Sequence, residues 1–333
     1  TEGISAMLQR KLASRLVSEI GLGCMNLNHA YAKKVDQVTA TSLLTKAFEA
    51  GVTHFDTAAL YGFGSNEKMV GEAIKPFRKD IFLASKCGMT GVNGKRTIDG
   101  HPATLKATLD TALTSLQTDH IDLYYLHRID PDVPVEESVG TLGDMVKAGK
   151  IGAVGLSEVS AETLRKAHGE YPIAALQTEY SLWTRNAEIA VLDACKDLGV
   201  DFVAFSPLAR GYLAGGVDPA SMGDGDIRKG MPRFQGDNWA ANQQLYADFA
   251  SLAASADITP AQLAMAWVLA QGEHIHALPG TSSEAHLLED LQASGLQLPP
   301  ELLVKADELI NRYTVKGARY PAGAQADIDT EDF

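Results

Sequence analysis

Four polar residues, Asp56, Tyr61, Lys86 and His127, are of the types that together can protonate a carbonyl oxygen. A tyrosine phenol has an ordinary pKa of about 10, and a nearby ammonium lowers that pKa and makes the phenol a better proton donor. Lys86 can supply this ammonium, and Asp56 would neutralise it, because an unpaired buried cation is costly. His127 can donate a hydrogen bond to an oxygen that gains negative charge. An acid and an oxyanion donor without a nucleophile suit addition to a carbonyl, with hydride supplied by a cofactor.

The spacing of these residues predicts that they share one site. Asp56, Lys86 and His127 each stand at the end of an apolar run, where each can be the last inward-pointing residue of a strand. They are 30 and 41 residues apart, about one strand and helix unit each, so their strands should be neighbours around one mouth. A structural ion pair would explain Asp56 and Lys86 equally well. The interpretation of Tyr61 as an acid therefore depends on all four residues converging.

One sequence pattern, a helical stretch that ends at a glycine and is followed by an apolar run, recurs along the chain. It defines the elements that must position these residues. Helical patterns end near Gly51, Gly149 and Gly199, and an apolar run of strand type follows each glycine. This repetition is typical of β-α-β units, whose parallel sheet is buried on both faces. The strand candidates are Ile20–Met25, Thr53–Ala58, Ile81–Lys86, Ile121–His127, Ile151–Ser157, Ala174–Glu179, Val200–Ser206 and His276–Gly280. The helical patterns are Thr39–Ala50, Ser65–Lys75, Pro102–Leu116, Val135–Ala148, Ala161–His168, Ile189–Leu198, Thr259–Gln271, Glu284–Gln292 and an extra terminal helix, Pro300–Arg312.

Eight parallel strands in a chain of 333 residues favour an α/β fold of the (β/α)8 TIM-barrel type. The alternative, a doubly wound dinucleotide-binding sheet, should carry GxGxxG after its first strand, and Gly21–Asn26 lacks the third glycine. No composition shift marks a linker, so we predict one domain over residues 1–333 with its core at about 15–312. Residues 209–238 form a long loop after strand seven, which is typical of a lid or binding loop. Residues 313–333 form an acidic tail that we expect to wrap the surface in contact with solvent.

Composition narrows the classes of function. Lys and Arg number 29 against 42 Asp and Glu, a formal charge of −13, which argues against nucleic-acid binding. No apolar run has the roughly 18–20 residues of a membrane helix, and the segment Thr1–Ile20 has no signal-peptide core. Three unclustered cysteines suit a reduced, cytoplasmic protein. No pattern indicates the oligomeric state.

Several strings around these residues resemble the aldo-keto reductase family, in order, from about residue 15 to residue 310. The resemblance implies a (β/α)8 barrel, reversible NAD(P)H-dependent reduction of aldehydes and ketones, and a catalytic tetrad of Asp56, Tyr61, Lys86 and His127. Gly155–Glu158 is similar to the stretch after strand five in the pyridoxal reductase and perakine reductase type. The strings are Phe55–Ala58 with Tyr61-Gly62, Ala84–Lys86, Leu126–Asp130, Gly155–Ser157, Gln177, Phe205–Leu208 and Pro279–Ser283.

The resemblance also implies a cofactor site. Ser157 and Gln177 match the positions that hold the nicotinamide carboxamide, Phe205 matches the stacking aromatic, and Glu158 replaces the usual Asn. The basic residues that commonly grip the 2′-phosphate are absent, but hydroxyl groups and backbone N–H groups can bind it, so we expect NADP(H) in preference to NAD(H) and no metal. The implied cofactor residues are Ser157, Gln177, Phe205, Ser206, Pro207, Leu208, Arg210, Gly280, Thr281, Ser282, His286, Glu289 and Asp290.

The expected partner is a small carbonyl compound, with Met25 and Trp183 as candidate pocket residues. The main alternative is a nucleotide-sensing binding module like the potassium-channel β subunits, with slow or vestigial turnover. A weaker alternative is a lyase in which Lys86 forms a Schiff base, although pairing with Asp56 would leave that amine protonated.

Overall fold

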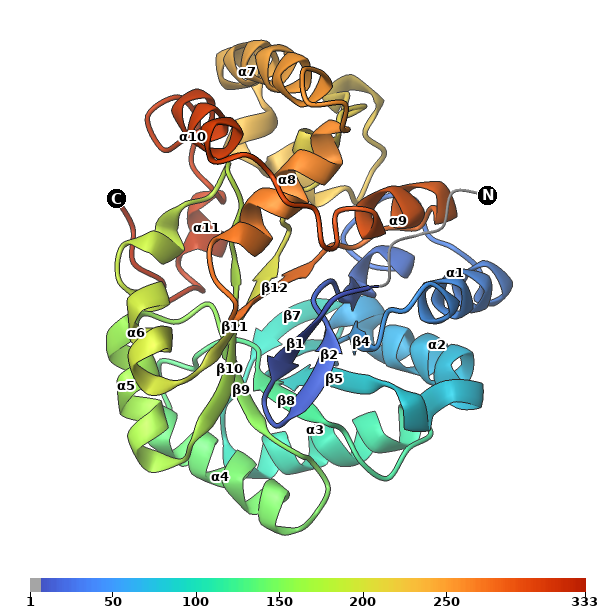
Figure 1. The fold of residues 1–333 in the computed structure, drawn as a ribbon. Helices are drawn as coiled ribbons and strands as arrows, with labels where there is room; N and C mark the ends of the chain where they lie inside the picture. Colours follow the sequence, from blue (N-terminus) through green and yellow to red (C-terminus); the bar gives the residue numbers. More distant parts are fainter. Residues whose placement is uncertain (1–6) are drawn as a thin grey trace.

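Eight parallel strands of the computed structural model follow one another around a barrel (Figure 1). Isolated bridges from Ile20 to Ala277 and from Gly23 to Gly280 join the first strand to the last, so the barrel is nearly closed. The (β/α)8 prediction is confirmed, and every predicted strand is present, most of them in shortened form. The strands are β3 (Leu22–Gly23), β4 (His54–Asp56), β5 (Phe82–Cys87), β8 (Leu123–Leu126), β9 (Val154–Ser157), β10 (Ile173–Glu179), β11 (Asp201–Phe205) and β12 (Ile275–Leu278).

The structure describes residues 7–333. The first six residues of the predicted 1–333 domain, and of the Thr1–Ile20 segment, lie outside the described residues. Across residues 7–333, no helix combines the length and the apolar character that crossing a membrane requires.

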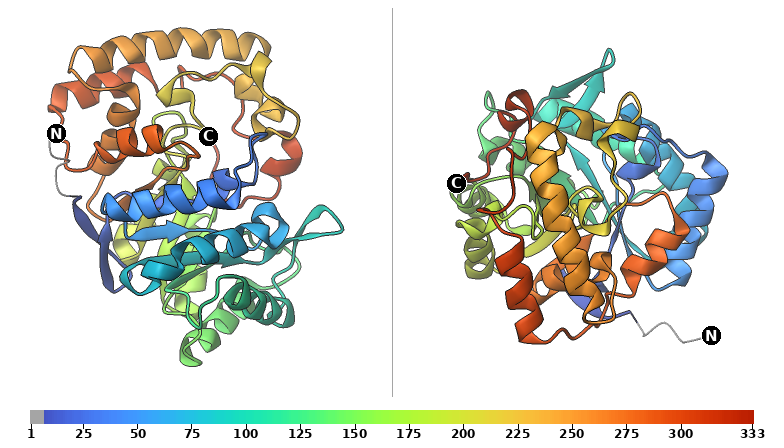
Figure 2. Two further views of the ribbon diagram at one scale, coloured as in Figure 1. Left: turned by 90° about the vertical axis from the view of Figure 1, so that its right-hand side faces the viewer. Right: turned by 90° about the horizontal axis from the view of Figure 1, so that it is seen from above.

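Helices surround the barrel and separate its strands along the chain (Figures 1 and 2). The sequence missed two of them: the short α11, within the predicted tail, and α7, whose first residues were assigned to the loop at 209–238. Only Asn242, Phe249 and Ala253 of α7 are buried, so it has little apolar periodicity to detect. The helices are α1 (Gln37–Glu49), α2 (Ser65–Ile74), α3 (Pro102–Ser115), α4 (Val135–Lys147), α5 (Ala161–Glu170), α6 (Val191–Leu198), α7 (Gly236–Ala254), α8 (Pro260–Ala270), α9 (Glu284–Leu291), α10 (Pro300–Leu309) and α11 (Ala322–Gln325).

Two antiparallel hairpins were also missed, because strands of four residues carry little periodic signal. The first pairs β1 (Gln9–Leu12) with β2 (Arg15–Ser18), and its buried Leu12 and Val17 cluster with residues of the barrel interior. The second pairs β6 (Met89–Val92) with β7 (Lys95–Ile98) directly after β5. The first hairpin therefore packs against the interior of the barrel, while the second extends the loop that follows β5.

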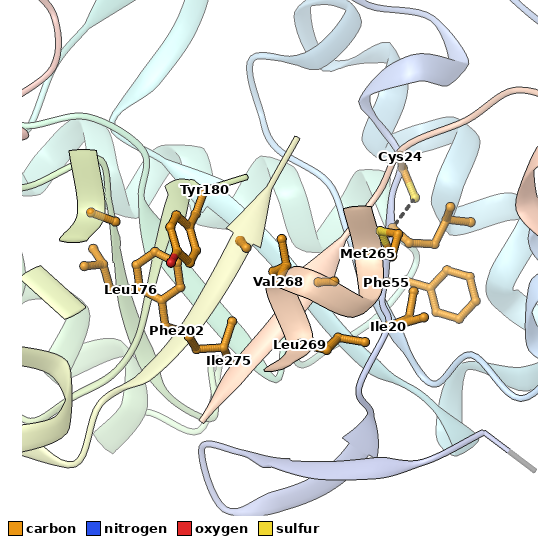
Figure 3. Packing of buried hydrophobic residues seen from close by; sticks show 14 of the residues in the cluster. Ile20, Cys24, Phe55, Leu176, Tyr180, Phe202, Met265, Val268, Leu269 and Ile275 are labelled. Atoms are coloured by element: carbon orange, nitrogen blue, oxygen red, sulfur yellow. Dashed lines mark hydrogen bonds between the residues drawn. The ribbon is translucent and has the colours of Figure 1, made fainter. Parts of the chain in front are cut away.

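The main core lies between the outer face of the barrel and the helices. Figure 3 shows Met265 and Val268 of α8 among outward side chains of the sheet such as Phe202. The interior is equally full: a Cβ on Gly155 would lie 2.4 Å from the Cδ1 atom of Tyr125. Because both faces of the strands are packed, polar side chains gather where the strands end.

Candidate active site

A cavity of about 680 Å³ opens where the strands end at their carboxyl termini. Its wall includes Asp56 at the end of β4, Tyr61 from the loop after β4, and His127 directly after β8. Lys86, near the end of β5, lies just beneath this wall and is 1% exposed. The sheet order places β4, β5 and β8 side by side, so the structure brings the four residues together at one mouth.

Lys86 is held by three acceptors at the base of the cavity. Its Nζ donates to the Oδ1 atom of Asp56, to the backbone oxygen of Thr57 at 2.9 Å and to the phenol oxygen of Tyr61 at 3.3 Å. The other oxygen of Asp56 accepts from the Nε2 atom of Gln177 at 2.8 Å. An ammonium has three hydrogens to donate, so this arrangement satisfies the buried cation and aims one of its N–H bonds at the phenol.

Burial is the main influence on the pKa values of Tyr61 and Lys86. Desolvation raises the pKa of Tyr61 above its ordinary value, and the charge of Lys86 opposes that rise only in part. Lys86 thus lowers the pKa of Tyr61 as predicted, and the opposing effect of full burial could not be seen in the sequence. Burial alone would lower the pKa of Lys86, but the carboxylate of Asp56 outweighs it and raises that pKa, so Lys86 remains charged.

A tight turn carries Tyr61, and His29 supports it. Gly62 and Phe63 have φ values of 55° and 51°, in the left-handed region. The Nδ1 atom of His29 accepts from the backbone N–H of Gly62 at 3.2 Å. The imidazole stacks on the Tyr61 ring with centroids 5.6 Å apart. The sequence had no signal for this contact, because residues 29 and 61 lie on different loops.

His127 is neutral in this environment. Burial lowers its pKa well below the ordinary value, and the charges of Arg128 and Lys86 lower it further. Its ring meets the Tyr61 ring edge-on, with centroids 5.8 Å apart. A neutral imidazole beside the phenol can donate one hydrogen bond into the cavity without adding charge.

The residues that the resemblance assigns to a cofactor surround the rest of the cavity. The side-chain amide of Gln177 donates a hydrogen bond to Asp56, so the amide oxygen of Gln177 remains available to a ligand. Phe205 lies at the end of β11 with its ring half-buried. The cavity is lined by Ser157, Gln177, Phe205, Ser206, Pro207, Leu208, Arg210, Gly280, Thr281, Ser282, His286, Glu289 and Asp290, and by Met25 among the candidate substrate residues.

The segment after β11 is a tight turn, in which the N–H groups of Ala209 and Gly211 donate to Ser206 and Leu208. Ser206, Ala209, Arg210 and Gly211 have φ values of 49°, 51°, 58° and 91°. Successive residues in or near the left-handed region can turn backbone N–H groups toward one point, as in phosphate-binding nests. A cavity of this volume, with such a nest, an aromatic face and amide and hydroxyl donors, fits a nicotinamide dinucleotide.

Arg210, which the resemblance assigns to the cofactor site, lines the cavity and also forms contacts within the protein. Its Nη2 donates to Oε1 of Glu179 at 2.8 Å and to the hydroxyl of Tyr320 at 2.9 Å. Only 7% of the side chain is exposed. The charge of Arg210 is thus already paired with Glu179 of β10, and Tyr320 of the C-terminal tail accepts a further hydrogen bond from it.

The tail itself corrects the prediction of a solvated surface wrap at 313–333. Arg319 is 7% exposed and donates to both carboxylate oxygens of Glu158, and its Nε lies 3.5 Å from Glu179. Tyr320, Pro321 and Ala324 line the cavity. Glu158, at the position of the usual Asn, is therefore bound to the tail, and the tail forms one wall of the site.

Trp183 is also corrected: it lies outside the cavity wall. It is 3% exposed and stacks on Tyr212 with centroids 4.2 Å apart and an interplanar angle of 8°. Its ring also meets Phe234 edge-on. Proximity to the end of strand six suggested a pocket residue, but the irregular segment before α7 folds over the indole and buries it.

Comparison with known proteins agrees with this geometry. The sequence profile of the Aldo/keto reductase family matches residues 19–311. The chain belongs to this family. It is 39% identical over 309 residues to the protein named Probable aldo-keto reductase 1 of Glycine max, covering 92% of this chain and 89% of that one. It is 38% identical over 327 residues to the aldo-keto reductase yakc of Schizosaccharomyces pombe, named with NADP(+), covering 96% of each.

Solved structures of aldo-keto reductases share the barrel. A glycerol dehydrogenase from Gluconobacter oxydans has a TM-score of 0.84 and 25% identity, covering 93% of this chain and 97% of that one. An aldo-keto reductase from Klebsiella pneumoniae, solved in complex with NADPH, has a TM-score of 0.71 and 25% identity, covering 92% and 96% of the two chains. The chain is thus an aldo-keto reductase by both sequence and fold.

Proposed function

We propose that this protein reduces aldehydes or small ketones to alcohols with NADPH, and that Tyr61 is the general acid. The observation that carries the proposal is the contact of 3.3 Å between the Lys86 ammonium and the Tyr61 hydroxyl, in the wall of a cavity large enough for a dinucleotide and a carbonyl compound. The relative from Schizosaccharomyces pombe is named with NADP(+), and the structure from Klebsiella pneumoniae contains NADPH. Both support NADP(H) as the preferred cofactor.

The four residues divide the work of proton transfer. Tyr61 donates its proton to the carbonyl oxygen, and the Lys86 ammonium stabilises the phenolate that is left. Asp56 keeps Lys86 charged and in place. His127 donates a hydrogen bond to the same oxygen while negative charge develops on it. Since its Nδ1 is buried without a partner among residues 7–333, this donation uses Nε2. When bound, the nicotinamide supplies the hydride.

The residues that would hold the cofactor lie along the cavity from the tetrad to α9. Ser157 and Gln177 would bind the carboxamide, and Phe205 would stack on the ring. The nest at Ser206–Gly211 would bind the pyrophosphate, and Thr281 and Ser282 would bind the 2′-phosphate. His286, Glu289 and Asp290 would surround the adenosine. No metal takes part in this proposal.

Within the family, the Gly155–Glu158 stretch supports the pyridoxal reductase and perakine reductase type. The three cysteines, Cys24, Cys87 and Cys195, are free and buried, which suits the reducing conditions of the cytoplasm. Both assignments are part of the proposal.

The test is Tyr61→Phe. Steady-state oxidation of NADPH with a panel of aldehydes should fall by roughly 10²–10⁴-fold, the usual contribution of a positioned acid. Titration by nucleotide fluorescence should show an unchanged dissociation constant for NADPH. Retained turnover would remove Tyr61 from the role of acid. Tight binding of NADPH by the wild type, with negligible turnover of every aldehyde, would instead favour the nucleotide-sensing module.

A further inference from the structure

Arg128 lies beside His127 in the cavity wall, and no carboxylate of residues 7–333 pairs with it. Lys86 is paired with Asp56, and Arg96, also in the cavity wall, is paired with Asp327. Arg128 follows His127 directly and lines the same cavity, but within residues 7–333 it forms no ion pair with an acidic side chain. The protein carries a net charge of −13, so an isolated positive charge at this place is notable.

The guanidinium of Arg128 is anchored and still has donors to spare. Its Nη1 donates to the backbone oxygen of His127 at 2.7 Å and lies 3.4 Å from the hydroxyl of Ser157. Its Nε and Nη2 have no acceptor in the part of the chain that the structure describes. These two nitrogens form the planar edge that binds a carboxylate through two parallel hydrogen bonds.

The charge of Arg128 affects the pKa values of two neighbouring residues. Burial and the charge of Arg128 lower the pKa of His127 well below its ordinary range. Burial and Arg128 also lower the pKa of Arg96, although Asp327 lies against it. A substrate with one negative charge would balance the guanidinium of Arg128, for which residues 7–333 provide no acidic partner.

We propose that Arg128 binds a carboxylate on the carbonyl substrate, so that the enzyme prefers aldehydes or ketones that carry a carboxylate near the reacting group. The inference rests on the proposed carbonyl reduction and deepens it by naming the class of substrate. A carboxylate bound beside His127 would orient the carbonyl oxygen toward Tyr61, because Arg128 is bonded to the backbone of His127 itself.

The experiment compares acids with amides of the same shape. NADPH oxidation is measured with 2-, 3- and 4-formylbenzoate, each against the matching formylbenzamide, and with 4-oxobutanoate against 4-oxobutanamide. In the wild type, at least one acid should exceed its amide in kcat/KM by roughly 10-fold or more, the value of one charge-assisted hydrogen-bonded pair. Arg128→Gln should abolish the preference by raising KM for the acid while turnover of the amide is kept.

Two further variants sharpen the result. Arg128→Lys keeps the charge without the planar edge and should keep part of the preference. Arg165→Gln removes an exposed arginine of α5 that pairs with Asp197, and it should leave both substrates unchanged. A variant that melts at the wild-type temperature excludes misfolding as the cause of any loss.

Other outcomes overturn the inference, and they can be told apart. Equal kcat/KM for every acid and its amide refutes the carboxylate site while the proposed reductase function stands. Equal losses for acids and amides in Arg128→Gln would show that Arg128 serves the cofactor or the chemistry instead. No oxidation of NADPH with these or with neutral aldehydes would refute the proposed function, and the inference with it.

Discussion

The two sides of the cavity are built in different ways. On one side, Asp56 and Lys86 belong to neighbouring parallel strands, whose register pairs Asp56 with Ala84 and Lys86 with Tyr125. On the other side, the tail lies outside the barrel sheet and is fixed by side-chain charges, chiefly the pair of Arg319 with Glu158. The reacting groups are thus positioned by the sheet, and the wall that faces them is positioned by ion pairs.

Two buried glutamates show the consequence of this difference. Glu67 lies on α2, behind the strands. Within the described residues it forms no ion pair, and burial raises its pKa to about 7. Glu179 is equally buried, yet the charges of Arg319 and Arg210 outweigh burial and lower its pKa to about 2. On the strand side, burial therefore favours the neutral form of Glu67. On the tail side, the arginines keep Glu179 ionised, and the ion pairs that hold the tail depend on this charge.

The largest expected effect comes from breaking the strand side with Lys86→Met. Without the cation, turnover of an aldehyde should fall by roughly 10²–10⁴-fold, and the pH profile of kcat should move, because the phenol loses the charge that stabilises its anion. The dissociation constant of NADPH should stay the same, since Lys86 lies beneath the cavity wall.

Lys86→Met also leaves Asp56 buried without its partner, which costs stability. The double variant Lys86→Met with Asp56→Asn removes both charges and separates this cost from the loss of catalysis. If Lys86→Met keeps the wild-type pH profile, the electrostatic role of Lys86 is refuted.

The next effect comes from breaking the tail side with Arg319→Met. The buried carboxylate of Glu158 then loses its charged partner, while Glu179 keeps Arg210, so the free energy of unfolding should fall by about 3–5 kcal/mol in chemical denaturation. KM for the carbonyl substrate should change more than kcat, because Tyr320 leaves the cavity wall while the tetrad keeps its geometry.

A matched control for the tail is Lys316→Met, which removes an exposed cation of the same segment and should change neither quantity. Glu158→Gln combined with Arg319→Met should recover part of the lost stability, because it removes the buried charge that Arg319→Met leaves without a partner. Unchanged unfolding and unchanged KM in Arg319→Met would show that the tail is held by other contacts.

The smallest effect concerns pH and sharpens the comparison of the two glutamates. The native pKa of Glu67, about 7, exceeds its unfolded value of about 4.5, so the unfolded state ionises first as pH rises and stability declines between these values. Glu67→Gln removes this pH-dependent loss of stability. The free energy of unfolding of the variant, relative to that of the wild type, should therefore rise by about 3 kcal/mol between pH 4.5 and pH 7.5.

Chemical denaturation at these two pH values measures the change in the Glu67 variant. Glu49→Gln, on an exposed position of α1, is the control and should show no such trend. Parallel stability curves for Glu67→Gln and the wild type would mean that Glu67 is ionised in the native protein.

The barrel and the cluster of reacting residues could be predicted from local patterns. Apolar runs after Gly51, Gly149 and Gly199 marked strands because both faces of a parallel sheet are buried. Residues at the ends of such strands must meet at one mouth, which placed Asp56, Lys86 and His127 together. Helix α7 was not predicted, because only three of its 19 residues are buried and its apolar residues therefore show little helical periodicity.

The amino-acid order alone determined where strands end, and hence which polar groups meet, because that depends on short-range periodicity and on the geometry of parallel strands. Only the tertiary structure decided how deeply Tyr61 is buried, that Arg210 is already paired, and that Trp183 lies in the core. It also decided that Arg319 pairs with Glu158, 161 residues before it, and that the neighbouring Tyr320 lies in the cavity wall. Contacts between distant charges and the desolvation of a phenol depend on the packed arrangement of the whole chain, and no local pattern encodes them.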